Sequence, residues 1–373
     1  MVAVDKVSLT PVSKLDDAFD RASELKAFDE TKAGVKGLVD AGVVEIPRIF
    51  YRPTKIDDSS SVETHLGVPV VDLEDVDKDP FKRREIVDKI REASETWGFF
   101  QAVNHGVPAR LQEEVINGVR RFYELDSEVK KQYYTRETTA PFVYNCNFDL
   151  FSAPAANWRD TFFTFMAPVS PRRQDLPEVC RDILVDYSKE IAKLGELVFE
   201  LLSEALGLKS THLLDLDCNE GLALVCHYYP PCPQPELTIG ATEHSDDTFI
   251  TVLLQTISEV FKCFNTTNGW IFLPFLEPSS SMLAAYYRQL VTNDRFVSSE
   301  HRVLANSEGC PRVSVASFFT TGPLPTSKRY RPIEELLSEE NRAKYREITV
   351  REYNLYFAEK GLDGTSALSH FRL

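Results

Sequence analysis

The sequence has no cysteine pattern that would indicate a disulfide framework or a zinc cluster. Its seven cysteines are irregularly spaced, and no two of them form a Cys-x-x-Cys pair. An odd number of cysteines without regular spacing is typical of reduced thiols in an intracellular protein. Structural disulfides and a zinc ion bound by several cysteines are therefore not expected.

Long apolar runs are also absent. No stretch reaches the roughly 18 apolar residues that a membrane-spanning helix requires. Charge already occurs at Asp5 and Lys6, before any apolar segment long enough for a signal peptide. We therefore expect a cytoplasmic protein that has no membrane partner.

The chain has fewer basic than acidic residues. The chain has 42 basic and 57 acidic residues, which gives a formal net charge of -15. Such a surface repels phosphate backbones, so nucleic acid is not an expected partner. A small anionic substrate needs only local positive charge and stays possible. With 373 residues, 43% of them hydrophobic, the chain can form one large domain or two smaller ones.

A short histidine and acid pattern is the most informative feature that the sequence does contain. His244 and Asp246 lie two residues apart, so on an extended segment both side chains point the same way. A further histidine, His301, follows downstream. Two imidazoles and one carboxylate on one face of a metal leave other positions open, as in non-haem Fe(II) oxygenases. A lone His-x-Asp pair is weak evidence, because chance produces about one in every two such chains.

A second pair, Arg312 and Ser314, is also spaced to share one face of a strand. A guanidinium can bind a carboxylate through two parallel hydrogen bonds, and the hydroxyl can add a third. By itself the pair is equally compatible with a surface arginine in a weak salt bridge. Upstream lies the run His-Tyr-Tyr-Pro-Pro-Cys-Pro-Gln-Pro-Glu-Leu, at residues 227–237.

The order and spacing of these motifs resemble the plant 2-oxoglutarate- and Fe(II)-dependent dioxygenases. Within them, the chain is most similar to the 1-aminocyclopropane-1-carboxylate oxidase homologues, and the resemblance spans nearly the whole chain. It implies an iron site and a cosubstrate site. The implied Fe(II) ligands are His244, Asp246 and His301, and the residues implied to hold the cosubstrate are Arg312, Ser314 and Tyr229. His227 stands where many members have asparagine.

The resemblance also implies an activity. We expect hydroxylation or desaturation of a small metabolite of plant secondary metabolism, with dioxygen consumed and succinate and CO2 released from 2-oxoglutarate. Ascorbate is a possible stimulant, and no catalytic residue is needed beyond the metal triad. The expected protein is a monomer. The sequence does not identify the substrate.

The expected fold is α+β: a double-stranded β-helix, or jelly-roll barrel, with flanking helices and an N-terminal helical arm. The predicted units are an arm at 1–66, a helix and strand module at 67–210, a jelly-roll core at 211–330 and C-terminal helices at 331–373. Periodicity and propensity predict strands at 68–73, 222–229, 249–254 and 313–320, with a strand and turn at 97–108. Predicted helices are 16–28, 32–40, 83–96, 109–124, 127–134, 177–207, 333–337 and 341–360.

Two segments have specific predictions. The aromatic-rich stretch 141–164 is expected to pass over the metal cavity, where some of its rings can line a substrate pocket. His105, at the end of a strand, is expected to be structural and satisfied by hydrogen bonds.

Residues 256–288 depart from the family pattern although the overall length is nearly preserved. The usual glycine-rich strand and turn segments are missing, and Gly269, Trp270, Ile271 and Pro274 are the only landmarks that stay. This content suggests local frame shifts, either in the gene prediction or in a decaying gene, which transcript sequencing would test. The stretch should supply strands that hold His301 opposite His244, but 282–290 favours a helix. We expect poorer folding and weak metal retention.

Three alternatives stay open. An ascorbate-dependent enzyme like 1-aminocyclopropane-1-carboxylate oxidase would consume ascorbate instead of releasing succinate. An inactive jelly-roll relative, suggested by the aberrant stretch, need not bind Fe(II). A zinc hydrolase could use the same two histidines and aspartate, but Arg312 and Ser314 would then have no purpose.

Overall fold

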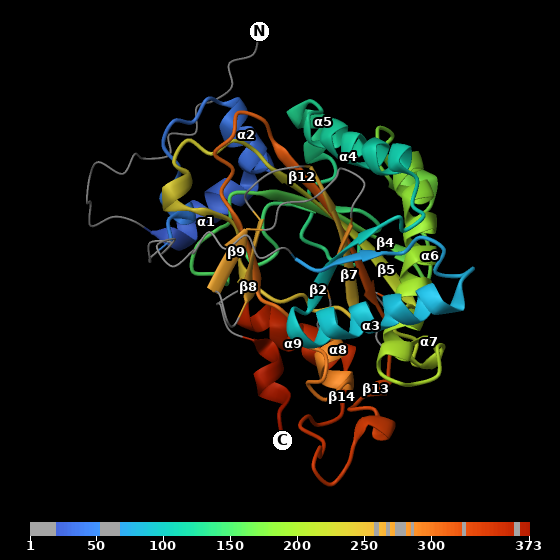
Figure 1. Cartoon of the computed structure of the whole chain (residues 1–373). Coiled ribbons are helices and arrows are strands. Elements are labelled where there is room, and N and C mark those ends of the chain that lie inside the picture. The colour runs from blue at the N-terminus through green and yellow to red at the C-terminus, as the bar shows by residue number, and fades with distance from the viewer. Residues whose placement is uncertain are drawn as a thin grey trace.

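Two β-sheets form the centre of the molecule (Figure 1). The computed structural model describes residues 20–52, 68–256, 261–265, 269–272, 281–284, 287–322, 326–361 and 366–373. The larger sheet has eight strands. In spatial order they are β1 (Val70–Asp72), β2 (Phe99–Val103), β10 (Ser281–Ala284), β7 (Ile250–Gln255), β12 (Arg312–Thr320), β5 (Gly221–Tyr229), β4 (Asp160–Ala167) and β3 (Val143–Asn145).

The smaller sheet has four strands and carries the candidate metal ligands. Its order is β6 (Ile239–His244), β11 (His301–Leu304), β8 (Phe261–Asn265) and β9 (Gly269–Phe272). Strands β6 and β11 are antiparallel, and their register places His301 directly opposite His244. A short third sheet joins β13 (Arg329–Tyr330) to β14 (Ile348–Thr349).

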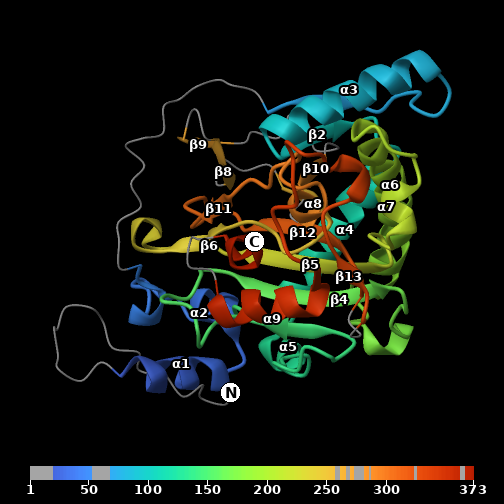
Figure 2. The same ribbon diagram turned by 90° about the horizontal axis from the view of Figure 1, so that it is seen from below.

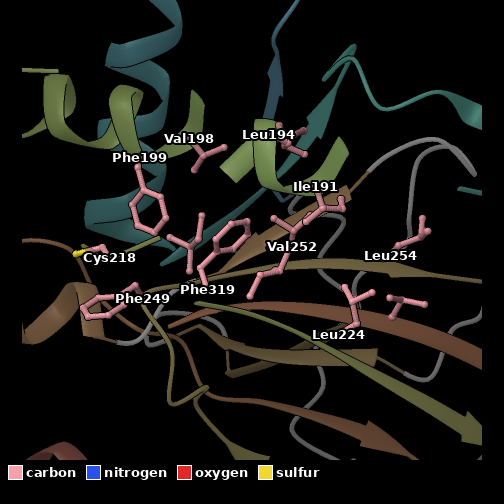
Figure 3. Packing of buried hydrophobic residues seen from close by; sticks show 14 of the residues in the cluster. Ile191, Leu194, Val198, Phe199, Cys218, Leu224, Phe249, Val252, Leu254 and Phe319 are labelled. Carbon is pink, nitrogen blue, oxygen red and sulfur yellow. The ribbon is translucent and has the colours of Figure 1, made fainter. Parts of the chain in front are cut away.

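The long helix α6 (Arg181–Ala205) packs on the larger sheet through an apolar stripe. Ile191, Val198 and Phe199 lie close to side chains of the sheet, including Phe319 (Figure 3). At Gly195 the helix comes so near that a Cβ atom would lie 2.1 Å from the Phe319 ring. Helices α3 (Pro80–Thr96) and α4 (Ala109–Tyr123) pack against α6, and α5 (Ser127–Lys131) and α7 (His212–Asp215) are shorter.

The N-terminal arm lies on another side of the sheets, away from α3 and α7 (Figure 2). It consists of α1 (Arg21–Glu30), α2 (Gly34–Asp40) and the 3-10 turn η1 (Arg48–Phe50). Phe28 packs edge-on against Phe50, and Phe50 packs edge-on against the fully buried Trp158 at a centroid distance of 5.1 Å. The arm therefore has an apolar core of its own that reaches the segment before β4.

Most predicted elements are confirmed, with boundaries that differ by a few residues. The helix predicted at 282–290 is wrong, because Ser281–Ala284 forms β10 between β2 and β7. Among the described residues of this range, those of α8 (Tyr287–Val291) are helical. Pairing on both sides here overrides local helix propensity. The helix predicted at 341–360 begins later, as α9 (Val350–Lys360), because Thr349 forms a capping box with Glu352. The predicted helix at 333–337 is a 3-10 turn, η4 (Glu334–Leu336). Other 3-10 turns are η2 (Arg173–Asp175), η3 (Pro235–Leu237) and η5 (Ala367–Phe371).

The divergent stretch contributes three strands, β8, β9 and β10. Strand β8 pairs with β11, so that Cys263 lies opposite His301. Strand β8 therefore flanks β11 on the side opposite β6, so the stretch does supply a strand beside His301. Poorer folding and weak metal retention stay predictions. Pro274 and the first residues of the helix predicted at 16–28 lie outside the described residues.

His105 is structural, as expected, because its Nδ1 accepts a hydrogen bond from the Val107 amide at 3.2 Å. In the part of the chain that the structure describes, no helix has the length and apolar character needed to cross a membrane.

Candidate active site

Three side chains converge at one end of strands β6 and β11 of the smaller sheet. Ligand atoms of His244, Asp246 and His301 all lie within 4.8 Å of one another. The Nε2 atoms of the two histidines are 3.7 and 3.5 Å from the Asp246 carboxylate, and the imidazole centroids are 4.3 Å apart. His244 ends β6 and His301 begins β11, so strand pairing sets the separation of the two rings. These donors and this spacing suit one divalent metal ion.

Hydrogen bonds to the backbone orient the imidazoles. The Nδ1 atom of His244 lies 2.6 Å from the Thr242 carbonyl, which leaves Nε2 facing Asp246. Such a carbonyl contact fixes the tautomer of a metal-binding histidine. Asn157 holds the same strand, because its Oδ1 accepts from the Thr242 amide and hydroxyl at 3.1 and 2.8 Å. Burial lowers the pKa of His244 well below its usual value, and the neutral imidazole is the form that binds a metal.

Arg312 is a nearly buried guanidinium on β12. Its Nη2 donates to the Gln255 side-chain carbonyl, and its guanidinium carbon lies 4.6 Å from the centre of the Tyr229 ring. Its Nε and Nη1 have no hydrogen-bond partner, and no carboxylate among the described residues pairs with it. A buried charge that lacks a counter-ion is costly, so this position is prepared for an anion.

One cavity between the two sheets, of about 60 Å³, brings all six predicted site residues together. Its lining includes the metal triad together with Tyr229, Arg312 and Ser314. A larger cavity of about 450 Å³ shares the side chains of His244 and Asp246. From the aromatic stretch, Phe148 and Phe163 line this larger cavity, whereas most of its other rings belong to the core.

Four residues near the site had no predicted role or an undecided one. His227 lines both cavities, and its Nδ1 lies 2.9 Å from the Thr161 hydroxyl. Arg159 also lines both cavities, and Asn157 and Glu243 hold the metal strand. Asn157 follows no motif. Glu243 could have been noticed as the neighbour of His244, and Arg159 from the alternating residues that follow it.

Glu243 links strand β6, which also carries His244, to two other parts of the chain. Its carboxylate accepts from both terminal nitrogens of Arg52 at 3.3 and 3.0 Å, and from Nη1 of Arg302 at 3.2 Å. Burial opposes ionisation, but the contacts with Arg52 and Arg302 and a backbone hydrogen bond together outweigh it and lower the pKa of Glu243. These ion pairs thus hold strands β6 and β11 together with the segment that follows the arm, beside the metal site.

Asp160, the first residue of β4, anchors the arm to that strand. Its two carboxylate oxygens accept from the amides of Val35 and Lys36 at 2.7 and 2.8 Å, in the first turn of α2. Gly34 adopts a φ of 67°, and a Cβ atom there would lie 2.3 Å from the carboxylate. Burial raises the pKa of Asp160 to about 6, although the two amides favour its ionised form.

Replacing Asp160 by alanine should release the arm. The substitution leaves the Val35 and Lys36 amides without acceptors, and each such loss costs about 1 to 3 kcal/mol. We expect the free energy of unfolding to fall by about 2 to 4 kcal/mol and proteases to cleave the arm faster. Chemical denaturation and limited proteolysis measure these effects. Asp160→Asn keeps one acceptor and should lie between the two; an alanine variant as stable as the wild type would contradict the anchoring.

Comparisons with known proteins give one family. Residues 220–321 match the 2OG-Fe(II) oxygenase superfamily, and residues 68–179 match the N-terminal region described as non-haem dioxygenase in morphine synthesis. A 1-aminocyclopropane-1-carboxylate oxidase homolog 3 of Arabidopsis thaliana is 52% identical over 366 residues, covering 96% of this chain and 99% of the relative. A homolog from Solanum lycopersicum is 48% identical and covers the same shares.

Solved structures agree. JOX2, crystallised in complex with 2OG, Fe and JA, is 27% identical with a TM-score of 0.77, covering 91% of this chain and 97% of that one. A dioxygenase for auxin oxidation from rice, 22% identical, shares the fold with a TM-score of 0.67, covering 82% and 100%. The chain therefore belongs to the 2OG-Fe(II) oxygenase superfamily, as a non-haem iron, 2-oxoglutarate-dependent oxygenase similar to the plant 1-aminocyclopropane-1-carboxylate oxidase homologues.

Proposed function

We propose that His244, Asp246 and His301 bind the Fe(II) ion and that Arg312 and Ser314, with Tyr229 beside them, hold 2-oxoglutarate. The enzyme then hydroxylates or desaturates a small plant metabolite and releases succinate and CO2. The observation that carries the proposal is the lining of one cavity by both groups of residues. A buried guanidinium with two unpartnered nitrogens faces the same space as three metal-type donors.

The residues present fit the iron and the keto acid. Two neutral imidazoles and one carboxylate form the ligand set of non-haem Fe(II) oxygenases and leave positions open for other ligands. When bound there, iron supplies the redox chemistry that couples decarboxylation of the keto acid to oxidation of a C–H bond.

The protein's own residues supply binding and exclusion of water. Arg312 pairs with the carboxylate far from the keto group, and Gln255 fixes the direction of its guanidinium. The Ser314 hydroxyl, on the same face of β12, adds a hydrogen bond. Both residues are almost completely buried, so water competes little for this carboxylate.

We further propose that the eight-stranded and four-stranded sheets together form the double-stranded β-helix expected from the sequence. The cavity lies between them, with β5, β7 and β12 on one side and β6, β8 and β11 on the other. The division into 1–66, 67–210, 211–330 and 331–373 stays a prediction.

Anaerobic calorimetry followed by an activity screen tests the proposed function. We expect one equivalent of Fe(II) to bind and 2-oxoglutarate to bind only when the metal is present. In air, suitable plant metabolites should stimulate succinate release in proportion to substrate oxidised. Ascorbate consumption without succinate release would instead indicate an oxidase of the ascorbate-dependent kind. Failure to bind Fe(II) would contradict the proposal and support an inactive relative.

A further inference from the structure

Arg159 is a buried cation that the proposed chemistry does not use. It lies directly before β4, is 5% exposed, and lines both the smaller and the larger cavity. Its Nε atom is buried without a hydrogen-bond partner, and no ion pair joins its guanidinium to any described residue. An uncompensated charge in such a place calls for an anionic ligand.

Asp247 also lines the larger cavity, but no ion pair among the described residues joins it to Arg159, and the two other acids near Arg159 are engaged elsewhere. Asp160 turns away and accepts from the amides of α2. Asp246 faces the two histidines of the triad. Arg159 also contributes, after burial, to lowering the pKa of His227, so its positive charge acts inside the site.

The backbone at Arg159 is fixed by contacts of the neighbouring residues. The Trp158 amide donates to the Ile239 carbonyl at 2.7 Å, and the Trp158 ring packs against the arm. Asn157 binds β6 and Asp160 binds α2, so the residues on both sides of Arg159 are fixed. A guanidinium on so fixed a backbone is suited to positioning a ligand.

The strand that follows Arg159 presents an apolar surface to the same cavity. Thr161, Phe163 and Phe165 alternate along β4 and all line the larger cavity, as Arg159 does. The intervening Phe162 is fully buried in the core. This side of the strand therefore changes from basic to aromatic with distance from Arg159.

Neighbouring strands repeat the same gradient. The strand register aligns Thr161 with His227, and His227 with Ser314. Two residues further along β4, Phe163 lies opposite Val225. Basic and polar groups thus cluster at one end of this sheet face, near the metal triad, and the rest is mostly apolar, with Thr320 as a polar exception. Such a surface matches a molecule that has one anionic end and an apolar body.

We propose that Arg159 binds a carboxylate of the primary substrate, whose apolar or aromatic body lies along Phe163 and Phe165. The proposal rests on the proposed function of the same site and adds the class of substrate. Phe163 lies four residue steps beyond Arg159, which corresponds to about 13 Å between the two backbone positions. A monocarboxylic acid with two to four methylene groups between its carboxyl group and a ring fits within this span.

The carboxylate that meets Arg159 could also come from 2-oxoglutarate. The smaller cavity is lined by Arg312, Ser314 and Tyr229, and none of these three lines the larger one. Arg159 lines both cavities. The larger cavity is rich in phenylalanine and suits an apolar body better than a second carboxylate. The primary substrate is therefore the favoured source, and separate binding measurements distinguish the two.

Calorimetry with matched probes tests the proposal. The protein, loaded anaerobically with Fe(II) and 2-oxoglutarate, is titrated with 3-phenylpropanoate, 5-phenylpentanoate and their primary amides. We expect each acid to bind at least about tenfold more tightly than its amide, because a buried charge pair is broken in the amide. Arg159→Gln should abolish this preference, and Arg159→Lys should retain part of it because the charge stays.

Three controls separate the explanations. Phe163→Ala should weaken acids and amides alike and keep the preference for acids. Arg121→Gln, which changes a half-exposed arginine on α4, should leave all affinities unchanged. Arg159→Gln should leave the Kd for 2-oxoglutarate within about threefold of the wild-type value, since Arg312 serves that ligand.

The proposal is overturned if acids bind no better than amides, if neither binds, or if Arg159→Gln keeps the preference. It is also overturned if that variant loses 2-oxoglutarate affinity, because Arg159 would then serve the cosubstrate. A wild-type protein that binds neither Fe(II) nor 2-oxoglutarate would instead contradict the proposed function. Circular dichroism confirms that each variant is folded.

Discussion

Replacing His301 by alanine is expected to lower Fe(II) affinity at least about 100-fold and to abolish succinate release. Even residues that only orient metal ligands cost 10- to 100-fold in affinity, and loss of a ligand should exceed this range. His301 supplies one of three donors that lie within 4.8 Å of one another. Metal content after anaerobic loading and dialysis, measured by atomic absorption, gives the result directly.

His212→Ala is the matched control, because His212 lies in the short helix α7 and lines neither cavity. This variant should retain iron and activity. If His301→Ala bound iron as tightly as the wild type, His301 would not be a ligand and the triad would have to be abandoned. Asp246→Ala should behave like His301→Ala, since its carboxylate lies between the two imidazoles.

The second large effect concerns Arg312. Replacing it by leucine should raise the Kd for 2-oxoglutarate about 30- to 4,000-fold, because losing one partner of a buried, hydrogen-bonded charge pair costs about 2 to 5 kcal/mol. Arg312 has no carboxylate partner within the described chain, so the substitution leaves no protein acid unpaired. Calorimetry on the iron-loaded protein measures the change.

Arg312→Lys separates charge from shape. Lysine keeps the charge but loses the two-pronged geometry, so we expect roughly tenfold weaker binding than in the wild type. Iron affinity should stay unchanged in both variants. A leucine variant that binds 2-oxoglutarate normally would show that the carboxylate is held elsewhere in the cavity.

The parts of the site that follow from sequence are those with short, regular spacing. His244 with Asp246, and Arg312 with Ser314, are pairs two residues apart, and resemblance to a family adds His301 and Tyr229. The structure brings all six to one cavity. Spacing alone could not place His301, because its distance from His244 depends on pairing between strands that are far apart in sequence.

Asn157 and Glu243 could not be predicted for the same physical reason. Each acts through a residue that is distant in the chain, Thr242 for Asn157 and Arg52 for Glu243, and one sequence does not show such contacts. Arg159 is different. The alternation Arg-x-Thr-x-Phe-x-Phe at 159–165 was a usable signal, since period two predicts that these side chains share a face. It was hidden within a stretch whose aromatic residues mostly serve the core.

The divergent stretch shows where local propensity fails. Residues 282–290 favour a helix by composition, yet 281–284 lie between β2 and β7 as a strand. Backbone pairing on both edges outweighs a preference of a few tenths of a kcal/mol per residue. The mixture of helices and sheets was accessible because several long apolar segments, such as Arg312–Thr320, have the composition of buried strands.

Anomalous X-ray diffraction at the iron edge, on crystals grown anaerobically with Fe(II) and 2-oxoglutarate, tests the central claim most directly. The account predicts a single strong iron peak in contact with His244, Asp246 and His301, and a keto acid whose far carboxylate meets Arg312. An iron peak at any other place, or a keto acid bound without Arg312, would contradict it.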